Sequence, residues 1–180
     1  SIFTKAEPIN INEEFESFRA FALDAGIPIL NEGPIKINFY AQLAALLGKT
    51  INPETEEQEA AGYGLIPLGL GAKLGLARFN FEFRMVPEGN FEFGYFDRSY
   101  EIERATFELG PDNRGNIITK SKKLGLYGPQ NGFYSSLLLN LGSLFDAKMA
   151  FQSLTGKMYN KQKGVFEDSD NQSFTSIVKL

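Results

Sequence analysis

A period of two in side-chain chemistry is the feature that most restricts how this chain folds. Between Ile35 and Leu47 every odd position is apolar, whereas the even positions begin with Lys36, Asn38 and Tyr40. Successive side chains of a β-strand point to opposite faces, so this pattern predicts a strand with one apolar and one largely polar face. At 3.3 Å per residue the segment would be about 43 Å long. We therefore expect an all-β chain of long amphipathic strands.

Other segments alternate in the same way. They cover residues 66–76, 78–85, 133–141, 145–152 and 174–180. Phe91, Phe93 and Tyr95 extend the aromatic alternation of residues 78–85, which predicts more strand there. The number of alternating segments predicts about seven or eight antiparallel strands.

Glycine marks one of these segments, residues 66–76. Ile66 and Leu68 share the even face with the leucines that follow, while Gly69 and Gly71 lie on the odd face. Glycine opposite a long apolar face suits a curved wall, because it relieves crowding where strands bend.

The first segment allows two interpretations. Asn12 would cap a helix over residues 12–25, with Gly26 as its C-terminal stop. The residues from Phe21 to Ile29 also alternate as a strand. We favour a strand over residues 20–30.

The connections alternate between short and long. Short turns are expected at residues 31–34, 76–78 and 142–143, and long polar loops at 49–61, 87–123 and 157–172. The first long loop is acidic, with Glu54, Glu56, Glu57 and Glu59. Short turns on one side and longer loops on the other are typical of up-and-down barrels in outer membranes.

Segments 35–47, 66–76, 78–85 and 133–151 resemble the wall strands of bacterial outer-membrane β-barrel proteins. Residues 64–75 look like their glycine-punctuated strands, and the run from Phe81 to Arg84 looks like their strand ends. The resemblance implies an antiparallel up-and-down transmembrane β-barrel in the bacterial outer membrane, in contact with membrane lipid. It implies a passive pore for small solutes or a structural scaffold. We expect one barrel domain over residues 1–180, incomplete at both ends, because the first residue is Ser1 rather than Met and the alternation still runs at residues 176–180.

Composition excludes several other classes of function. The chain has no histidine and no cysteine, which removes Ser–His and Cys–His catalysis and argues against zinc or haem. The net charge is -4 and no basic block is present, so we expect no nucleic-acid partner. We expect no enzyme activity, no catalytic residue, no metal and no cofactor.

Charged residues at the polar positions are the candidates for a lumen lining. They are Asp24, Lys36, Lys73, Arg78, Glu82, Arg84, Asp146 and Lys148. Because their signs are mixed, we expect them to pair with one another and to give any pore weak selectivity. The opposite, lipid-facing set is predicted to include Phe79, Phe81, Phe83, Leu137, Leu139 and Phe151.

A soluble lipocalin-like barrel is the alternative. Its apolar faces would point inward around a small apolar ligand, and its charged faces would point to water. The period of two is the same in both cases, so the sequence pattern alone does not separate them. Loop asymmetry and the glycine-bearing face favour the membrane.

Overall fold

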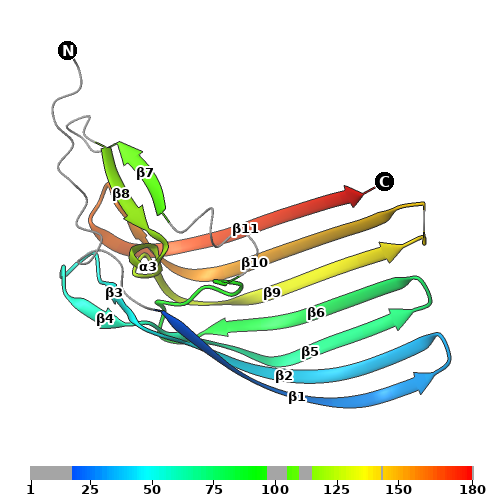
Figure 1. The fold of residues 1–180 in the computed structure, drawn as a ribbon. Helices are drawn as coiled ribbons and strands as arrows, with labels where there is room; N and C mark the ends of the chain where they lie inside the picture. Colours follow the sequence, from blue (N-terminus) through cyan, green and yellow to red (C-terminus); the bar gives the residue numbers. More distant parts are fainter. Residues whose placement is uncertain (1–17, 97–104, 110–114, 143, 180) are drawn as a thin grey trace.

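A computed structural model describes residues 18–96, 105–109, 115–142 and 144–179 of the chain. The described residues form an all-β structure whose main element is one seven-stranded antiparallel sheet (Figure 1). Its strands are, in spatial order, β1 (Arg19–Glu32), β2 (Ile35–Leu47), β5 (Tyr63–Leu74), β6 (Ala77–Val86), β9 (Tyr127–Asn140), β10 (Asp146–Asn160) and β11 (Val165–Lys179). Each of these strands pairs with the one that precedes it in this order, which makes the sheet an up-and-down meander.

Three smaller elements lie at one end of the sheet. They are the hairpin β3 (Lys49–Ile51) and β4 (Gln58–Ala60), the hairpin β7 (Ala105–Leu109) and β8 (Gly115–Thr119), and the short helix α3 (Lys120–Leu124). We call this end the loop end. The opposite end, where tight turns join β1 to β2, β5 to β6 and β9 to β10, is the turn end.

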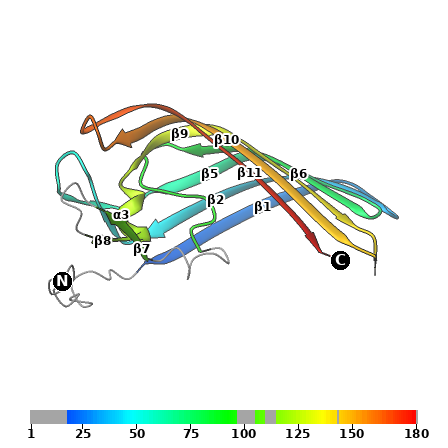
Figure 2. The ribbon, with the colours of Figure 1, turned by 90° about the horizontal axis from the view of Figure 1, so that it is seen from above.

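The sheet is bent into an arch, and α3 and the β7–β8 hairpin lie under it (Figure 2). We call the face that α3 packs against the inner face, and the opposite one the outer face. β1 and β11 are the two edge strands of the sheet.

Several boundaries agree with the sequence. The strand predicted from Ile35 to Leu47 is β2 with the same bounds. Residues 19–32 form β1 rather than a helix, which confirms the favoured interpretation for the described part of that segment. The period of two held here against helical spacing because β1 pairs along its length with β2.

The prediction that Ile66 and Leu68 share one face of β5 was wrong, and so was the prediction of a loop at residues 157–172. A register shift between Leu65 and Leu68 turns Ile66 to the inner face, where it is 2% exposed, while Leu68 stays outside and is 53% exposed. Such a bulge inserts an extra residue into one strand and shifts the phase of the alternation. Pro67 lies in the bulge, where its missing N–H costs no ladder hydrogen bond.

The long polar loop expected at residues 157–172 is a tight turn between β10 and β11. The Asn160 side chain accepts hydrogen bonds from the backbone N–H groups of Gln162 and Lys163, and Gly164 has a φ of +71°. Polar residues on both sides of the turn pair across the strands, as Lys157 does with Asp168 at 2.7 Å. Polarity alone therefore does not identify a loop here.

Candidate functional site

The inner face of the sheet collects all eight residues predicted as a lumen lining. The strand registers align Lys36 with Lys73 and Arg78, and place Lys148 at the same level two strands further along. The other four lie at positions of the same parity on β1, β6 and β10. The predicted lipid-facing set, from Phe79 to Phe151, shares the outer face.

A hydrogen-bonded network crosses the middle of the inner face. Arg84 Nη2 lies 2.6 Å from Glu82 Oε2, and Arg84 Nη1 donates to Gln152 Oε1. Tyr40 Oη donates to the other oxygen of Glu82, Oε1, at 2.8 Å. The network joins β2, β6 and β10, and both carboxylate oxygens of Glu82 are occupied. It therefore braces the sheet rather than offering a free base.

Glycine and tyrosine meet at the same place. Gly69 lies opposite Tyr40, and the Tyr40 ring occupies the space that a Cβ at position 69 would need. An aromatic ring over a strand glycine is a recurrent device in curved sheets. Tyr40 is thus held flat along the inner face, with its hydroxyl directed to Glu82.

Arg84 also contacts the segment that covers the inner face. Its guanidinium carbon lies 3.9 Å from the Tyr134 ring centroid and 4.8 Å from that of Phe93. Stacking of this kind is weak in water and stronger once the ring and cation are desolvated. Residues 87–96 are therefore tied to the strand residues beneath them.

The loop end of the inner face is apolar and covered. Phe91, Phe93 and Tyr95 do not continue a strand, contrary to the sequence prediction, because they turn back onto the sheet. Gly64 leaves room for the rings of Phe91 and Phe93. The residues buried together here are Leu46, Val86, Phe91, Tyr95 and Leu124.

The β3–β4 hairpin and α3 complete this cover. Thr50 Oγ1 donates to the Ser121 carbonyl at 2.7 Å and accepts from the Gly125 N–H at 2.9 Å. Residues 87–123 therefore do not form a loop alone, as the sequence predicted, but contain β7, β8 and α3. Phe91, Tyr95 and Leu124 are buried in this region, so a segment that looked like a charged loop in the sequence forms part of a packed cover.

The predicted pairing among the eight lining residues is found at one place, between Glu82 and Arg84. Asp24 accepts from Gln42 Nε2 at 2.6 Å, and Asp146 accepts from Asn140 Nδ2. The prediction of general internal pairing was wrong because the register aligns residues of the same sign, Lys36, Lys73 and Arg78, across adjacent strands.

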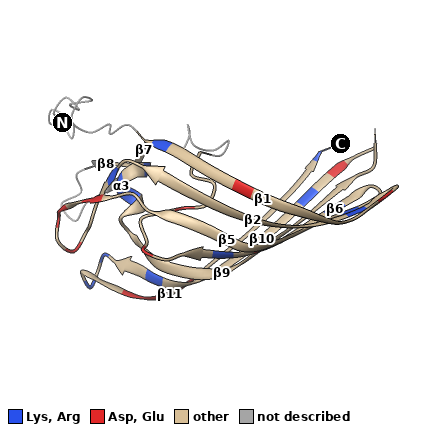
Figure 3. Cartoon of the chain, turned by 90° about the horizontal axis from the view of Figure 1, so that it is seen from below, with Lys and Arg blue, Asp and Glu red and all other residues tan. Residues whose placement is uncertain are grey.

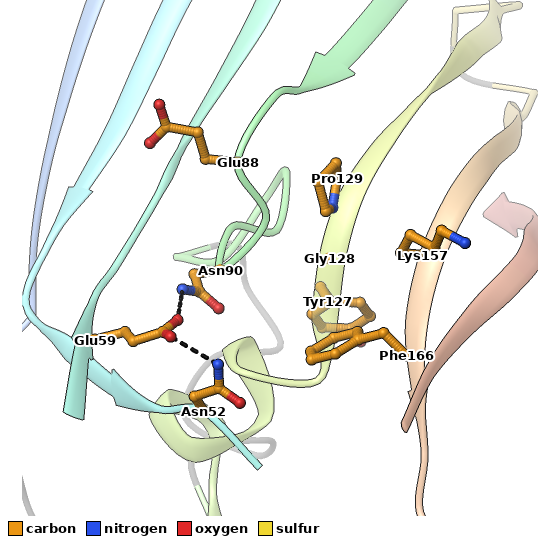
Figure 4. Close-up of a pocket in the computed structure, with 9 residues that line it drawn as sticks. All are labelled: Asn52, Glu59, Glu88, Asn90, Tyr127, Gly128, Pro129, Lys157 and Phe166. Carbon is orange, nitrogen blue, oxygen red and sulfur yellow. Dashed lines mark hydrogen bonds between the residues drawn. The ribbon is translucent and has the colours of Figure 1, made fainter. Parts of the chain in front are cut away.

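A cavity of about 260 Å³ lies at the loop end. Glu59 accepts from Asn52 Nδ2 at 2.7 Å and from Asn90 Nδ2 at 3.0 Å, and Tyr127 and Phe166 lie across the cavity from it (Figure 4). These hydrogen bonds lower the pKa of Glu59 below its ordinary value of 4.5. An ionised, hydrogen-bonded carboxylate suits a clamp between the β3–β4 hairpin and residue 90 rather than a general acid.

The described residues contain no candidate metal site. No group of three or more acidic residues in that part of the chain could hold a metal ion. No buried side-chain nitrogen or oxygen there lacks a hydrogen-bond partner. The described helix is also too short to cross a membrane.

Sequence reasoning missed several residues of the inner face. Tyr40, Tyr134 and Gln152 stand at polar positions of alternating strands, but they carry no charge and were not selected. Thr50 lies in a segment taken as a loop, and Leu124 comes directly after another. The signal that could have found Tyr40 is an aromatic residue at a polar position of one strand together with glycines at the polar positions of the next strand, as at Gly69 and Gly71.

Comparisons of the chain with protein-family models, with curated proteins and with solved structures gave no match.

Proposed function

We propose that the chain forms the wall of a bacterial outer-membrane β-barrel, with the outer face against lipid and the inner face toward a lumen that a covering segment narrows at the loop end. The observation that carries the proposal is the distribution of exposure over the two faces. Phe81 is 38% exposed on the outer face, whereas the side chain of its neighbour Glu82 is 13% exposed on the inner face. Soluble proteins rarely leave so continuous an apolar surface uncovered.

The apolar surface forms a belt across all seven strands. One row of paired residues runs through Ile27, Phe39, Leu70, Phe81, Ser135, Phe151 and Phe174, with a single polar member. Figure 3 shows that long stretches of the strands carry no charged residue.

The height of the belt supports the same proposal. Every outer position of β6 from Ala77 to Met85 is apolar. These nine residues match the roughly 9–11 residues that a tilted transmembrane β-strand needs to cross the hydrocarbon core.

A barrel requires that both edges of the sheet be paired. Open edges are not tolerated in hydrocarbon, because each unpaired N–H or C=O costs several kcal/mol. The proposal therefore requires β1 and β11 to pair with each other or with further strands. We propose a passive pore or scaffold rather than an enzyme, since the chain has no histidine or cysteine.

The lipocalin-like alternative has less support. It requires the apolar face inside, but the segments that fold over the sheet cover the polar-bearing face.

Spin labels test the proposal directly. The chain has no cysteine, so Phe79→Cys and Asn80→Cys each give one labelling site, on the outer and inner face of β6. In vesicles carrying the full-length protein, the label at 79 should collide with oxygen and the label at 80 with a water-soluble paramagnetic reagent. The opposite result, or release of the protein from membranes by alkaline wash, would contradict the proposal.

A further inference from the structure

A row of basic residues crosses the inner face at the turn end. Lys36 on β2 lies directly opposite Lys73 on β5, and Lys73 lies directly opposite Arg78 on β6. Directly paired residues have Cβ atoms about 4.5–5.5 Å apart, and like charges at that spacing are destabilising. Lys148 on β10 lies at the same level, separated from Arg78 by Leu138 of β9. All four basic residues are exposed.

The carboxylates of this face do not neutralise the row. Glu82 lies four residues from Arg78 along β6, about 13 Å away, and is already bound by Arg84 and Tyr40. Asp24 is paired six positions beyond Lys36 along β2, about 20 Å away.

Asp146 is the carboxylate at the same end of the face. It lies two residues from Lys148, accepts a hydrogen bond from Asn140 and is paired in register with Lys179. The described strand residues of this end therefore bring five basic side chains to the inner face against one carboxylate. They are Lys36, Lys73, Arg78, Lys148 and Lys179.

We propose that this basic row makes the turn end of the lumen an anion-binding and anion-selecting site, suited to solutes that carry phosphate groups. The inference rests on the proposed function, since it requires the inner face to line a pore. A lysine ammonium acts as a point charge, and the arginine fork binds oxyanions through two parallel hydrogen bonds. Three strands about 5 Å apart space the cations over about 10 Å, which matches several linked phosphates better than a single small anion.

The inference reverses the weak selectivity expected from the sequence. Rings of one sign select ions of the other sign, whereas balanced linings do not. The strand register, rather than the total charge of the lining residues, decides whether the lumen has a one-sign lining or a balanced one.

Ion selectivity of the full-length protein is the test. In planar bilayers of neutral phosphatidylcholine, which exclude anionic lipid as the source of phosphate, a KCl gradient should give an anion-preferring reversal potential. Lys73→Glu should lower the anion-to-cation permeability ratio by at least about sevenfold, because a two-unit charge change at about 7 Å in water alters the energy of one monovalent ion by about 1.2 kcal/mol. Arg78→Lys keeps the charge and should keep the sign of the potential.

Lys49→Glu is the matched control. Lys49 is an exposed lysine of β3 at the loop end, where it donates to Gln58 Oε1 at 3.2 Å. A wild-type pore without anion preference, or equal shifts in Lys73→Glu and Lys49→Glu, would overturn the inference while leaving the barrel proposal in place.

Binding of inorganic tripolyphosphate to the protein in neutral detergent distinguishes failure of the anion-site inference from failure of the pore proposal. If no conductance is seen but Lys73→Glu weakens binding and Lys49→Glu does not, the anion site stands and the pore falls. If neither variant changes the affinity, the anion site falls whatever the conductance.

Discussion

The same three strands, β2, β5 and β6, contribute to both ends of the inner face, but the two ends differ in burial and in charge. At the loop end β2, β5 and β6 contribute Leu46, Ile66 and Val86, which are buried. At the turn end the same strands contribute Lys36, Lys73 and Arg78, which are exposed. A strand face is therefore not one environment. What covers it decides whether a side chain there stabilises the fold or remains available for a solute.

The middle of the face separates the two ends. Arg84 contacts Glu82 and Gln152 on the sheet and the ring of Phe93 in the covering segment. It is the point where the covered region ends and the open region begins. If the barrel proposal holds, solutes would pass the cover at one end and the basic row at the other.

The largest expected effect of a substitution is at the covered end. Leu124 is fully buried, so Leu124→Ala should lower the free energy of unfolding by about 2–5 kcal/mol, through lost burial and the cavity left behind. Leu144, 72% exposed in a turn, provides the control, and Leu144→Ala should change it by at most about 0.5 kcal/mol. Urea unfolding in detergent micelles measures both. Equal effects would show that the cover is not a packed core.

Gly64 sharpens the comparison within the covered end. A Cβ at this position would overlap the Phe91 and Phe93 rings, so Gly64→Ala should cost about 1–3 kcal/mol by overpacking. Gly26→Ala adds the same methyl group on β1, where the nearest atom is 3.5 Å away and no clash arises. Faster proteolysis of residues 87–96 in Gly64→Ala alone is the expected readout. Unchanged proteolysis would mean that the rings do not rest on Gly64.

At the turn end we expect a substitution to raise the free energy of unfolding rather than lower it. Lys73→Gln removes a charge flanked by two like charges, so it should raise the free energy of unfolding by about 0.2–1 kcal/mol. The gain should shrink at 1 M salt, where screening acts over about 3 Å. Lys49→Gln, outside the row, should show no gain. Destabilisation by Lys73→Gln would indicate that Lys73 has a stabilising role in the free protein.

The smallest effect concerns the Glu59 clamp and pH. Hydrogen bonds from Asn52 and Asn90 lower the pKa of Glu59, so the ionised form is the one the fold stabilises. The contribution is present above the ordinary value of 4.5 and is lost as pH falls through the lowered pKa. Glu59 is only partly buried, so solvent screening keeps the effect small.

An NMR titration of the Glu59 carboxyl checks this. Asn90→Ala removes one donor and should bring the pKa of Glu59 back toward its ordinary value, while the turn end is unaffected. A pKa that does not move in Asn90→Ala would show that the clamp is not formed in solution.

Local patterns predicted the strands well where each strand pairs along its whole length. The bounds of β2 and the facing of β6 followed from alternation, because pairing and burial reinforce the same period. The turn at residues 161–164 was missed because its flanking strands are polar, and polar strands lack the apolar face that the pattern requires. The phase of β5 was missed because a bulge at Pro67 has no periodic signature.

Within each stretch of strand without a bulge, the sequence by itself determined which residues share a face, since the two-residue period of a strand is a property of the backbone. It thereby placed the eight charged candidates on polar faces and Phe79, Phe81 and Phe83 on the face opposite Arg78, Glu82 and Arg84. The tertiary structure alone decided which of those residues are neighbours. Register sets Lys36 beside Lys73 and Arg78. It also sets Glu82 beside Tyr134, whose ring contacts Arg84, and these pairings join segments that are distant in the chain. It also decided that Phe91 and Leu124 fold onto the sheet, because that burial depends on the space left at Gly64 and between strands rather than on any local pattern.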